Sequence, residues 1–209
     1  MNTSAANQGK TSPFEDHDSG DVQLLIEQYP LAWVCTKGGA EASQLPLIGV
    51  FNEAGRLYEL IGHCARRNPL VSALTHDPSA LILFSGPSGY ISPRMTNRRD
   101  WGPTWNYANI RISAEITIDP DLTAEAIHML ARKMEHGHDK AWSVYELKER
   151  YNQLFPLIVG FRARVKDLQA RFKLCQDEQT SDYQPIIANL ENGDLRDWML
   201  RFNRWRHSA

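Results

Sequence analysis

Apolar and polar residues alternate over a long stretch in the middle of the chain. From residue 107 to residue 118 every second side chain is Ala or Ile, and the intervening side chains are mainly polar or charged. A period of two kept this long predicts a β-strand with one wall in a core. Residues 159–165 alternate in the same way, and residues 168–176 are expected to continue that strand or to pair with it.

Shorter patterns predict the remaining elements. Residues 31–36 form one strand, and the apolar run 80–86 predicts another that is buried on both faces. Residues 45–64 indicate two strands joined by a turn at 52–55, which is a hairpin pattern. Helices are expected at residues 24–30, 68–78, 122–135 and 140–154, and an apolar stripe predicts one more across 192–205. Asn68 is expected to cap the second of these helices, with Pro69 at its first position.

These elements favour a β-rich α+β fold, an antiparallel sheet or barrel with peripheral helices. The six or seven expected strands are mostly neighbours in sequence, which argues against a doubly wound parallel sheet. We expect a flexible N-terminal tail over residues 1–20 and a single domain over residues 21–209 that includes the C-terminal helix. The chain contains neither a GxGxxG nor a GxxxxGK[ST] motif, so a dinucleotide fold and a P-loop are not supported.

Composition narrows the class of protein. The chain has 209 residues, of which 42% are apolar and 23% charged, and its formal net charge is −2. No apolar run approaches the roughly 20 residues that span a membrane, and no apolar leader is evident at the start. Three widely spaced cysteines suit reduced thiols in a cytoplasmic protein. A domain-wide electrostatic grip on nucleic acid is not expected at this charge.

Three polar clusters lie at the ends of expected strands. The first, residues 62–69, contains His63, Arg66, Arg67 and Asn68 just before a helix begins. Guanidinium groups bind phosphate oxygens, and the N–H groups at a helix N-terminus add positive partial charge, so this cluster suits a phosphorylated ligand. The alternative is that both arginines are solvated surface charges.

The second and third clusters follow one another. Residues 85–103 are rich in Gly, Pro and Ser, and the segment is either a functional loop or a mobile surface loop. Its Tyr90 and Ser92 offer hydroxyl groups, and Arg94, Arg98 and Arg99 offer positive charge. In the third cluster, "PTWNY", Thr104 and Asn106 can hydrogen-bond a ring edge, and Trp105 and Tyr107 can stack on a flat ring. The alternative for this cluster is a bulky plug in the core.

Two other chemistries have weaker support. The run "MEHGHD" places His136 and His138 two residues apart, but it follows a helix and no third metal ligand is evident, so no metal site is predicted. The cysteines show no arrangement with His and Asn that would indicate a thiol nucleophile.

Five blocks of the chain together resemble a known family. They are "LIGHCARRNPL", "GPSGYISP", "PTWNY", "LIVGFRARV" and "ARFKLCQ", in this order. They resemble the PaiB-like FMN-binding negative transcriptional regulators over residues 24–190. The resemblance implies a split β-barrel of the FMN-binding type, usually a homodimer that holds FMN near the subunit interface.

The resemblance also implies cofactor-binding residues. His63, Arg66 and Asn68 would lie near the ribityl phosphate, and Tyr90 and Ser92 match the family's YISP block. The remaining implied residues are Thr104, Trp105, Asn106 and Tyr107 of the PTWNY block, and Lys173 and Gln176 of a late K-L-S-Q-N block.

The chain departs from the family pattern at three places. Gln44 stands where His is usual, and Arg94–Thr96 follow the YISP block where a Trp-Tyr pair is usual. Cys175 and Asp177 replace Ser and Asn in the late block. FMN binding is therefore retained, weakened or retuned, and Arg98 and Arg99 are candidates for replacement phosphate donors or for recognition of an anionic substrate.

Three functions remain open at this point. The first is a flavin-binding regulator; DNA contact has only a weak candidate, the C-terminal helix with Arg196, Arg201, Arg204 and Arg206. The second is an FMN-dependent oxidoreductase, similar to flavin reductases or pyridoxamine-phosphate oxidases, acting on a small molecule or NAD(P)H. Its catalytic residues are unknown, and Tyr90, His63 and Arg94 are only candidates to polarise a substrate. The third is a barrel that has lost flavin and binds haem or another small ligand.

Overall fold

The computed structural model describes residues 12–207, which form two compact units. The first unit comprises residues 18–86 and 109–170, and the second contains residues 12–17, 87–108 and 171–207. The predicted tail falls largely on residues outside the described range, and its flexibility stays a prediction, as does the single domain. The first helix, α1, already begins at Ser19.

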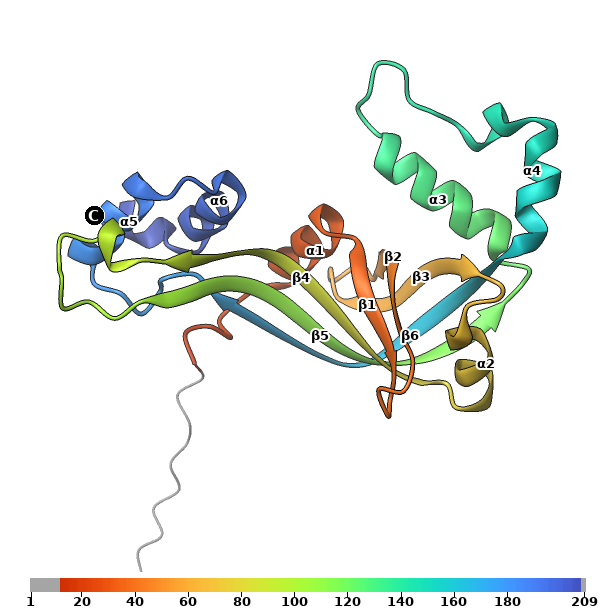
Figure 1. Cartoon of the computed structure of the whole chain (residues 1–209), viewed down its shortest axis with the longest axis horizontal. Helices are drawn as coiled ribbons and strands as arrows, with labels where there is room; N and C mark the ends of the chain where they lie inside the picture. The colour runs from red at the N-terminus through yellow and green to blue at the C-terminus, as the bar shows by residue number, and fades with distance from the viewer. Residues whose placement is uncertain (1–11, 208–209) are drawn as a thin grey trace, which may run out of the picture. The chain divides into compact units, whose positions relative to one another are not determined.

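Six strands in the described part form a closed barrel in the order β1-β2-β3-β6-β5-β4 (Figure 1). They are β1 (Leu31–Thr36), β2 (Ala42–Phe51), β3 (Leu57–Ala65), β4 (Ser79–Ile91), β5 (Thr104–Asp119) and β6 (Ile158–Lys173). β1 closes the barrel because it pairs antiparallel with both β2 and β4. The predicted antiparallel barrel is confirmed.

The alternation along β5 follows from this closure. Ala108, Ile110, Ile112, Ala114 and Ile116 are buried, and the residues between them are exposed or half-buried. The same alternation of inward and outward side chains corrects the expectation for β4, which was predicted to be buried on both faces. Ile82 and Phe84 are fully buried, but Leu81 and Leu83 are only half-buried, because the outer wall of the barrel is not covered there.

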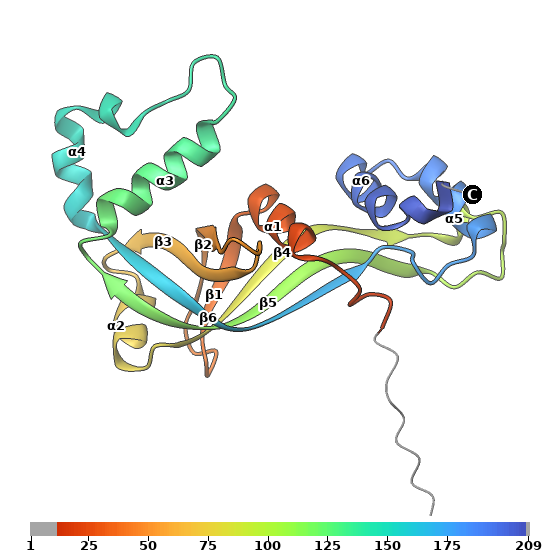
Figure 2. The same ribbon diagram turned by 180° about the vertical axis from the view of Figure 1, so that it is seen from behind.

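Helices surround the barrel in the first unit (Figure 2). α1 (Ser19–Gln28) starts with a capping box, in which the Asp18 side chain accepts from the Asp21 N–H and the Asp21 side chain accepts from the Asp18 N–H. α2 (Pro69–His76) is capped by Asn68 as predicted. α3 (Thr123–Glu135) packs Ala126 and Met129 against Ile61 of β3 and Val50 of β2.

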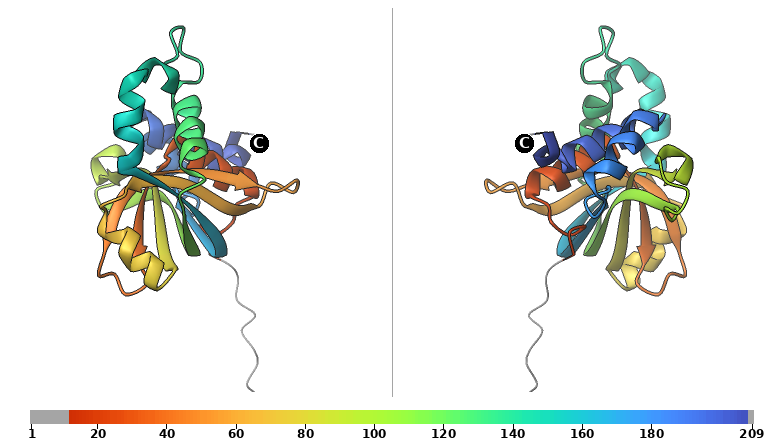
Figure 3. Two further views of the ribbon diagram at one scale, coloured as in Figure 1. Left: turned by 90° about the vertical axis from the view of Figure 1, so that its right-hand side faces the viewer. Right: turned by 90° about the vertical axis from the view of Figure 1, so that its left-hand side faces the viewer.

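The segment between β5 and β6 contains α3, a 3-10 turn η2 (Val144–Leu147), α4 (Glu149–Leu154) and a 3-10 turn η3 (Phe155–Leu157). Figure 3 shows α3 and α4 standing side by side, joined by the loop above them. A single helix over 140–154 was predicted, and this is wrong. The helix is interrupted at Lys148, whose φ of 50° is incompatible with a right-handed helix.

The second unit contains the far ends of β4, β5 and β6, the 3-10 turn η1 (Pro93–Met95), α5 (Thr180–Asn189), α6 (Gly193–Phe202) and η4 (Arg204–His207). Its core includes a stack of Phe172 on Trp198 and Phe202, with ring centroids 5.7 and 4.7 Å apart. α5 was not predicted. The predicted loop over 85–103 is shorter than expected because β4 continues to Ile91, and β6 runs unbroken to Lys173.

Among the described residues, no helix combines the length and apolar character needed to cross a membrane.

Gly160 of β6 provides a test of how closely α3 is seated. Its N–H donates to the Thr123 hydroxyl oxygen at 2.9 Å, and a Cβ at this position would lie 2.9 Å from the Thr123 backbone nitrogen. The Gly160→Ala variant should therefore lower the free energy of unfolding by about 1–3 kcal/mol, because backbone atoms must move. Urea denaturation measures the change.

The matched control is Gly38→Ala, because no atom lies within 4 Å of a Cβ there. Its effect should stay within about 0.5 kcal/mol. Equal stability of Gly160→Ala and Gly38→Ala would contradict the close seating of α3.

Candidate functional site

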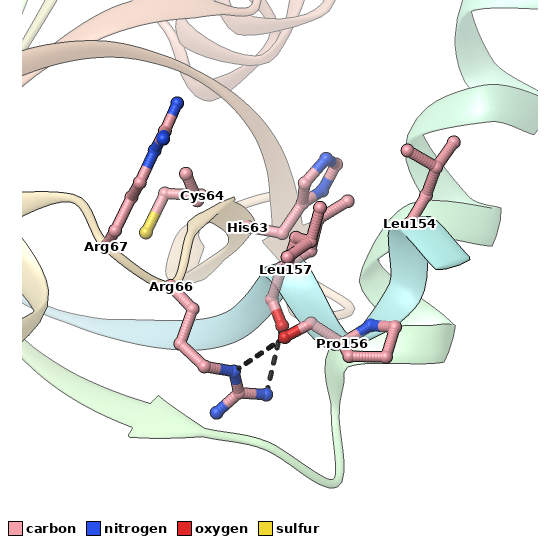
Figure 4. Close-up of a pocket in the computed structure, with 9 residues that line it drawn as sticks. His63, Cys64, Arg66, Arg67, Leu154, Pro156 and Leu157 are labelled. Carbon is pink, nitrogen blue, oxygen red and sulfur yellow. Dashed lines mark hydrogen bonds between the residues drawn. The ribbon is translucent and has the colours of Figure 1, made fainter. Parts of the chain in front are cut away.

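A pocket of about 780 Å³ opens where β3 ends and β6 begins. Leu154, Pro156, Leu157 and Ile158 supply an apolar wall, and His63, Arg66 and Arg67 supply the polar groups (Figure 4). The volume falls within the range of small-molecule and cofactor sites. The pocket therefore combines apolar area with positive charge in one concave site.

Strand pairing brings these distant segments together. β3 and β6 are antiparallel, with Ala65 opposite Ile158 and His63 opposite Gly160. The pairing continues past the strand end, where the Arg66 N–H donates to the Leu157 carbonyl at 2.8 Å. The Arg66 guanidinium also donates to the carbonyls of Pro156 and Ile158, at 3.2 and 3.0 Å. Arg66 thus holds the apolar wall against β3.

The Arg67 and His63 side chains extend away from these carbonyls and from the Arg66 guanidinium (Figure 4). Arg67 is exposed and, within residues 12–207, forms no ion pair. The Nδ1 atom of His63 is buried and has no hydrogen-bond partner among the described residues. Burial lowers the pKa of His63, so the imidazole is neutral at pH 7. Both groups are available to a ligand that brings oxygen atoms.

Asn68 and Cys64 contribute differently. The Asn68 side chain accepts from the Leu70 N–H at 3.0 Å and donates to the Ser43 hydroxyl at 3.1 Å, so its amide is already used to cap α2. Asn68 does not line the pocket. Cys64 does line it, but burial raises the pKa of its thiol and disfavours the nucleophilic thiolate.

The other predicted site residues lie in the second unit. Tyr90 and Trp105 are about half exposed, and their ring centroids are 5.9 Å apart. The Tyr107 hydroxyl accepts from Nε of Arg171 at 3.3 Å, and Lys173 hydrogen-bonds the Thr104 hydroxyl. Phe14 lies beneath both cations, 5.1 Å from Arg171 and 6.0 Å from Lys173. These contacts form an aromatic and cationic surface.

Three predicted residues in this unit have structural contacts. The Asn106 side chain is 1% exposed and donates to the Cys175 sulfur at 3.0 Å, and its Oδ1 has no partner among the described residues. Ser92 caps η1 by accepting from the Arg94 N–H. The Gln176 side chain accepts from the Leu174 N–H and donates to the Phe172 carbonyl. Flavin contact by these residues stays a prediction.

Cys175 differs from the family pattern and occupies an unusual backbone position. Its φ is 68°, which is rare for a residue other than glycine. Burial raises the pKa of its thiol to about 11, so the side chain stays protonated near neutral pH. The thiol therefore acts as a buried hydrogen-bonding partner of Asn106.

The sequence did not indicate Leu154, Pro156, Leu157 and Ile158 as pocket residues. No local pattern could have identified them, because they reach the pocket only through the pairing of β3 with β6. Arg67 belonged to the first polar cluster but had no counterpart among the cofactor-binding residues implied by the family resemblance.

A family model described as "Putative FMN-binding domain" matches residues 10–167. The chain belongs to this FMN-binding domain family. A curated relative, the protease synthase and sporulation protein PAI 2 of Bacillus subtilis, is 32% identical over 184 residues, which is 86% of this chain and 87% of that protein. The family resemblance seen in the sequence is confirmed, and with it the PaiB-like character of the chain.

A more distant relative of this chain is an uncharacterised protein of Aspergillus fumigatus. It is 28% identical over 171 residues, which is 63% of this chain and 66% of that protein.

Solved structures with similar folds support the split barrel. The FAD and heme binding protein from Mycobacterium smegmatis superposes with a TM-score of 0.58 at 14% identity, covering 83% of this chain and 78% of that one. A flavocytochrome from Azotobacter vinelandii gives a TM-score of 0.54 at 16% identity, covering 74% and 67%. At these identities the likeness extends to the fold alone.

Proposed function

We propose that this member of the FMN-binding domain family binds FMN in the pocket at the end of β3. The observation that carries the proposal is that the exposed Arg67 and an apolar wall line the same pocket of about 780 Å³. Arginine binds phosphate through two parallel N–H donors, and it keeps its charge at any physiological pH.

The residues present fit the cofactor. Leu154, Leu157 and Ile158 offer apolar area for a flat ring system, and Arg67 offers the charge that a phosphate requires. The unpartnered, buried Nδ1 of His63 would regain a hydrogen bond from a ligand atom. Bound FMN would supply hydride or electron transfer, and the protein would position it and exclude water.

The choice of FMN over other cofactors is part of the proposal. The family description favours FMN, whereas the similar folds include a protein named for binding FAD and heme. A pocket that selects FMN requires a terminal phosphate contact, and Arg67 suits that contact.

For the output of the bound flavin, we propose redox chemistry in preference to direct DNA recognition by the C-terminal helix. The arginines of the C-terminal helix were the DNA candidates. Arg206, however, donates to the carbonyls of Cys175, Gln176 and Glu178, and its guanidinium lies 4.9 Å from the Tyr183 ring. Leu195, Trp198 and Met199 of α6 are buried. These residues hold the second unit together, which leaves little of the segment for DNA.

We also propose that the protein is a homodimer that assembles through the outer wall of β1 and β4. Leu31 and Trp33 are 51% and 44% exposed, and Leu83 of β4 lies opposite Trp33 in the strand register. Exposed apolar side chains that adjoin one another often mark protein interfaces.

A cytoplasmic location, expected from the sequence, remains part of the proposed function.

The Arg67→Gln variant tests the cofactor site. It should weaken FMN binding by about 10-fold or more, because a charge-assisted hydrogen bond to phosphate is lost. Riboflavin, which lacks the phosphate, should bind the variant and the unmodified protein with equal affinity. Titration of the apo-protein with each flavin, followed by flavin fluorescence, measures both affinities.

The control for this experiment is Arg56→Gln, which removes a positive charge next to the opposite end of β3. It should leave both affinities unchanged. An Arg67→Gln variant that binds FMN as tightly as the Arg56→Gln control would contradict a phosphate site at Arg67. An unmodified protein that takes up no flavin at all would refute FMN binding.

If the bound FMN takes part in redox chemistry, NADH or NADPH should bleach the yellow absorbance of the FMN-loaded protein under anaerobic conditions. Admitting air should restore the colour through reoxidation. If the flavin stays oxidised with both nucleotides, and the protein binds its own promoter DNA in a salt-sensitive manner, a regulatory role would be favoured instead.

The homodimer predicts that Trp33→Glu shifts the protein toward monomer, because a charge replaces an apolar side chain in the interface. Sedimentation velocity measures the mass at several concentrations. Tyr58→Glu is the control, because Tyr58 is 49% exposed on β3, outside the proposed face. An unmodified protein that sediments as a monomer, or two variants with the same distribution, would overturn this assembly.

A further inference from the structure

A second pocket, of about 550 Å³, lies within the segment between β5 and β6. α3 forms one side with His128, Arg132 and Glu135, and residues 136–145 form the other side with Trp142 and Tyr145. This pocket shares no lining residue with the proposed FMN site.

The two sides of α3 explain why the pocket forms. One stripe of the helix, with Ala126 and Met129, packs against the barrel. His128, Arg132 and Glu135 follow one another at spacings of four and three residues, so they share another stripe. The chain after α3 turns back beside the helix (Figure 3), and its residues 136–145 line the pocket together with this second stripe.

Specific hydrogen bonds hold the returning chain in place. The Glu135 carboxylate accepts from the Trp142 N–H at 3.0 Å. Ser143 and Glu146 form a reciprocal capping box at the start of η2, and Val144 is buried. The wall that carries Trp142 and Tyr145 is therefore bonded to α3 at Trp142 and ordered by its own capping box.

Two features of the pocket indicate a ligand. Trp142 is 40% exposed and Tyr145 is 81% exposed, and the Tyr145 ring centroid lies 5.2 Å from that of His128. Large aromatic rings left exposed in a cavity offer a stacking surface. In the part of the chain that the structure describes, the exposed Arg132 guanidinium has no ion pair, although it lines the same cavity.

We propose that this pocket binds a small aromatic carboxylate. The ring would lie against Trp142 and Tyr145, and the carboxylate would accept two N–H donors from Arg132. The opposite polarity, an aromatic cation paired with Glu135, is disfavoured, because Glu135 is half-buried and already bonded to the Trp142 N–H. Glu135 would instead repel the carboxylate from its own end of the pocket and so fix the orientation of the ligand.

Isothermal titration of the full-length protein tests the proposal, with and without FMN, so that the two sites are assessed separately. The probes are indole-3-acetate and 4-hydroxyphenylacetate, compared with the neutral indole-3-acetamide and the cationic tryptamine. The carboxylates should bind saturably, and the amide and the amine should bind at least about 10-fold more weakly, because the charged contact to Arg132 is missing. FMN should not compete.

Two substitutions on the same helix locate the binding. Arg132→Gln should weaken carboxylate binding by about 10-fold or more, whereas Lys133→Gln removes the same charge from a residue outside the pocket and should have no effect. The carboxylate affinity of the Arg132→Lys variant should lie between those of the other two, because lysine keeps the charge and loses the bidentate geometry. Unchanged thermal unfolding shows that the variants fold.

Three outcomes would overturn the proposal. They are the absence of saturable carboxylate binding, equal losses in Arg132→Gln and Lys133→Gln, and binding of tryptamine as strong as that of indole-3-acetate. Competition by FMN would also refute a separate site. The first three outcomes do not depend on whether the protein binds FMN at β3.

Discussion

The antiparallel pairing of β3 with β6 is the contact on which the proposed cofactor site depends. It sets Ala65 opposite Ile158, and it brings a polar cluster near residue 65 to an apolar wall about ninety residues later. Arg66 extends the pairing with its own backbone and guanidinium donors. Arg66 is thereby fixed in the structure, whereas its neighbour Arg67 remains exposed and lines the pocket.

Neighbouring residues also have different roles in the second unit. Thr104, Trp105, Asn106 and Tyr107 are consecutive, yet strand alternation separates their surroundings. Trp105 is 57% exposed, whereas Asn106 is 1% exposed and bonded to Cys175. A motif that looks uniform as a string of hydrogen-bonding and aromatic residues therefore contains both surface groups and a core residue.

The sequence could predict what depends on local periodicity. The inward positions of β5, the hairpin of β2 and β3, and the cap at Asn68 all follow from patterns within a few residues. It could not predict the break at Lys148 or the positive φ of Cys175, because each depends on contacts made after the chain has folded. The apolar wall at residues 154–158 could not be predicted for the same reason, whereas the arginines of the same pocket were evident in the sequence as a cluster.

The family match ends at residue 167, but the partners of Asn106 lie beyond it. Nδ2 of Asn106 contacts the sulfur atoms of Cys175 and Met199, and Asn203 donates to the carbonyls of Leu174 and Met199. A fragment cut where the family match stops would expose the Asn106 amide of the PTWNY block and would lack the aromatic stack of Phe172, Trp198 and Phe202. The residues matched by the family model are thus fewer than the residues that pack around Asn106, and recombinant fragments should retain the chain beyond residue 167.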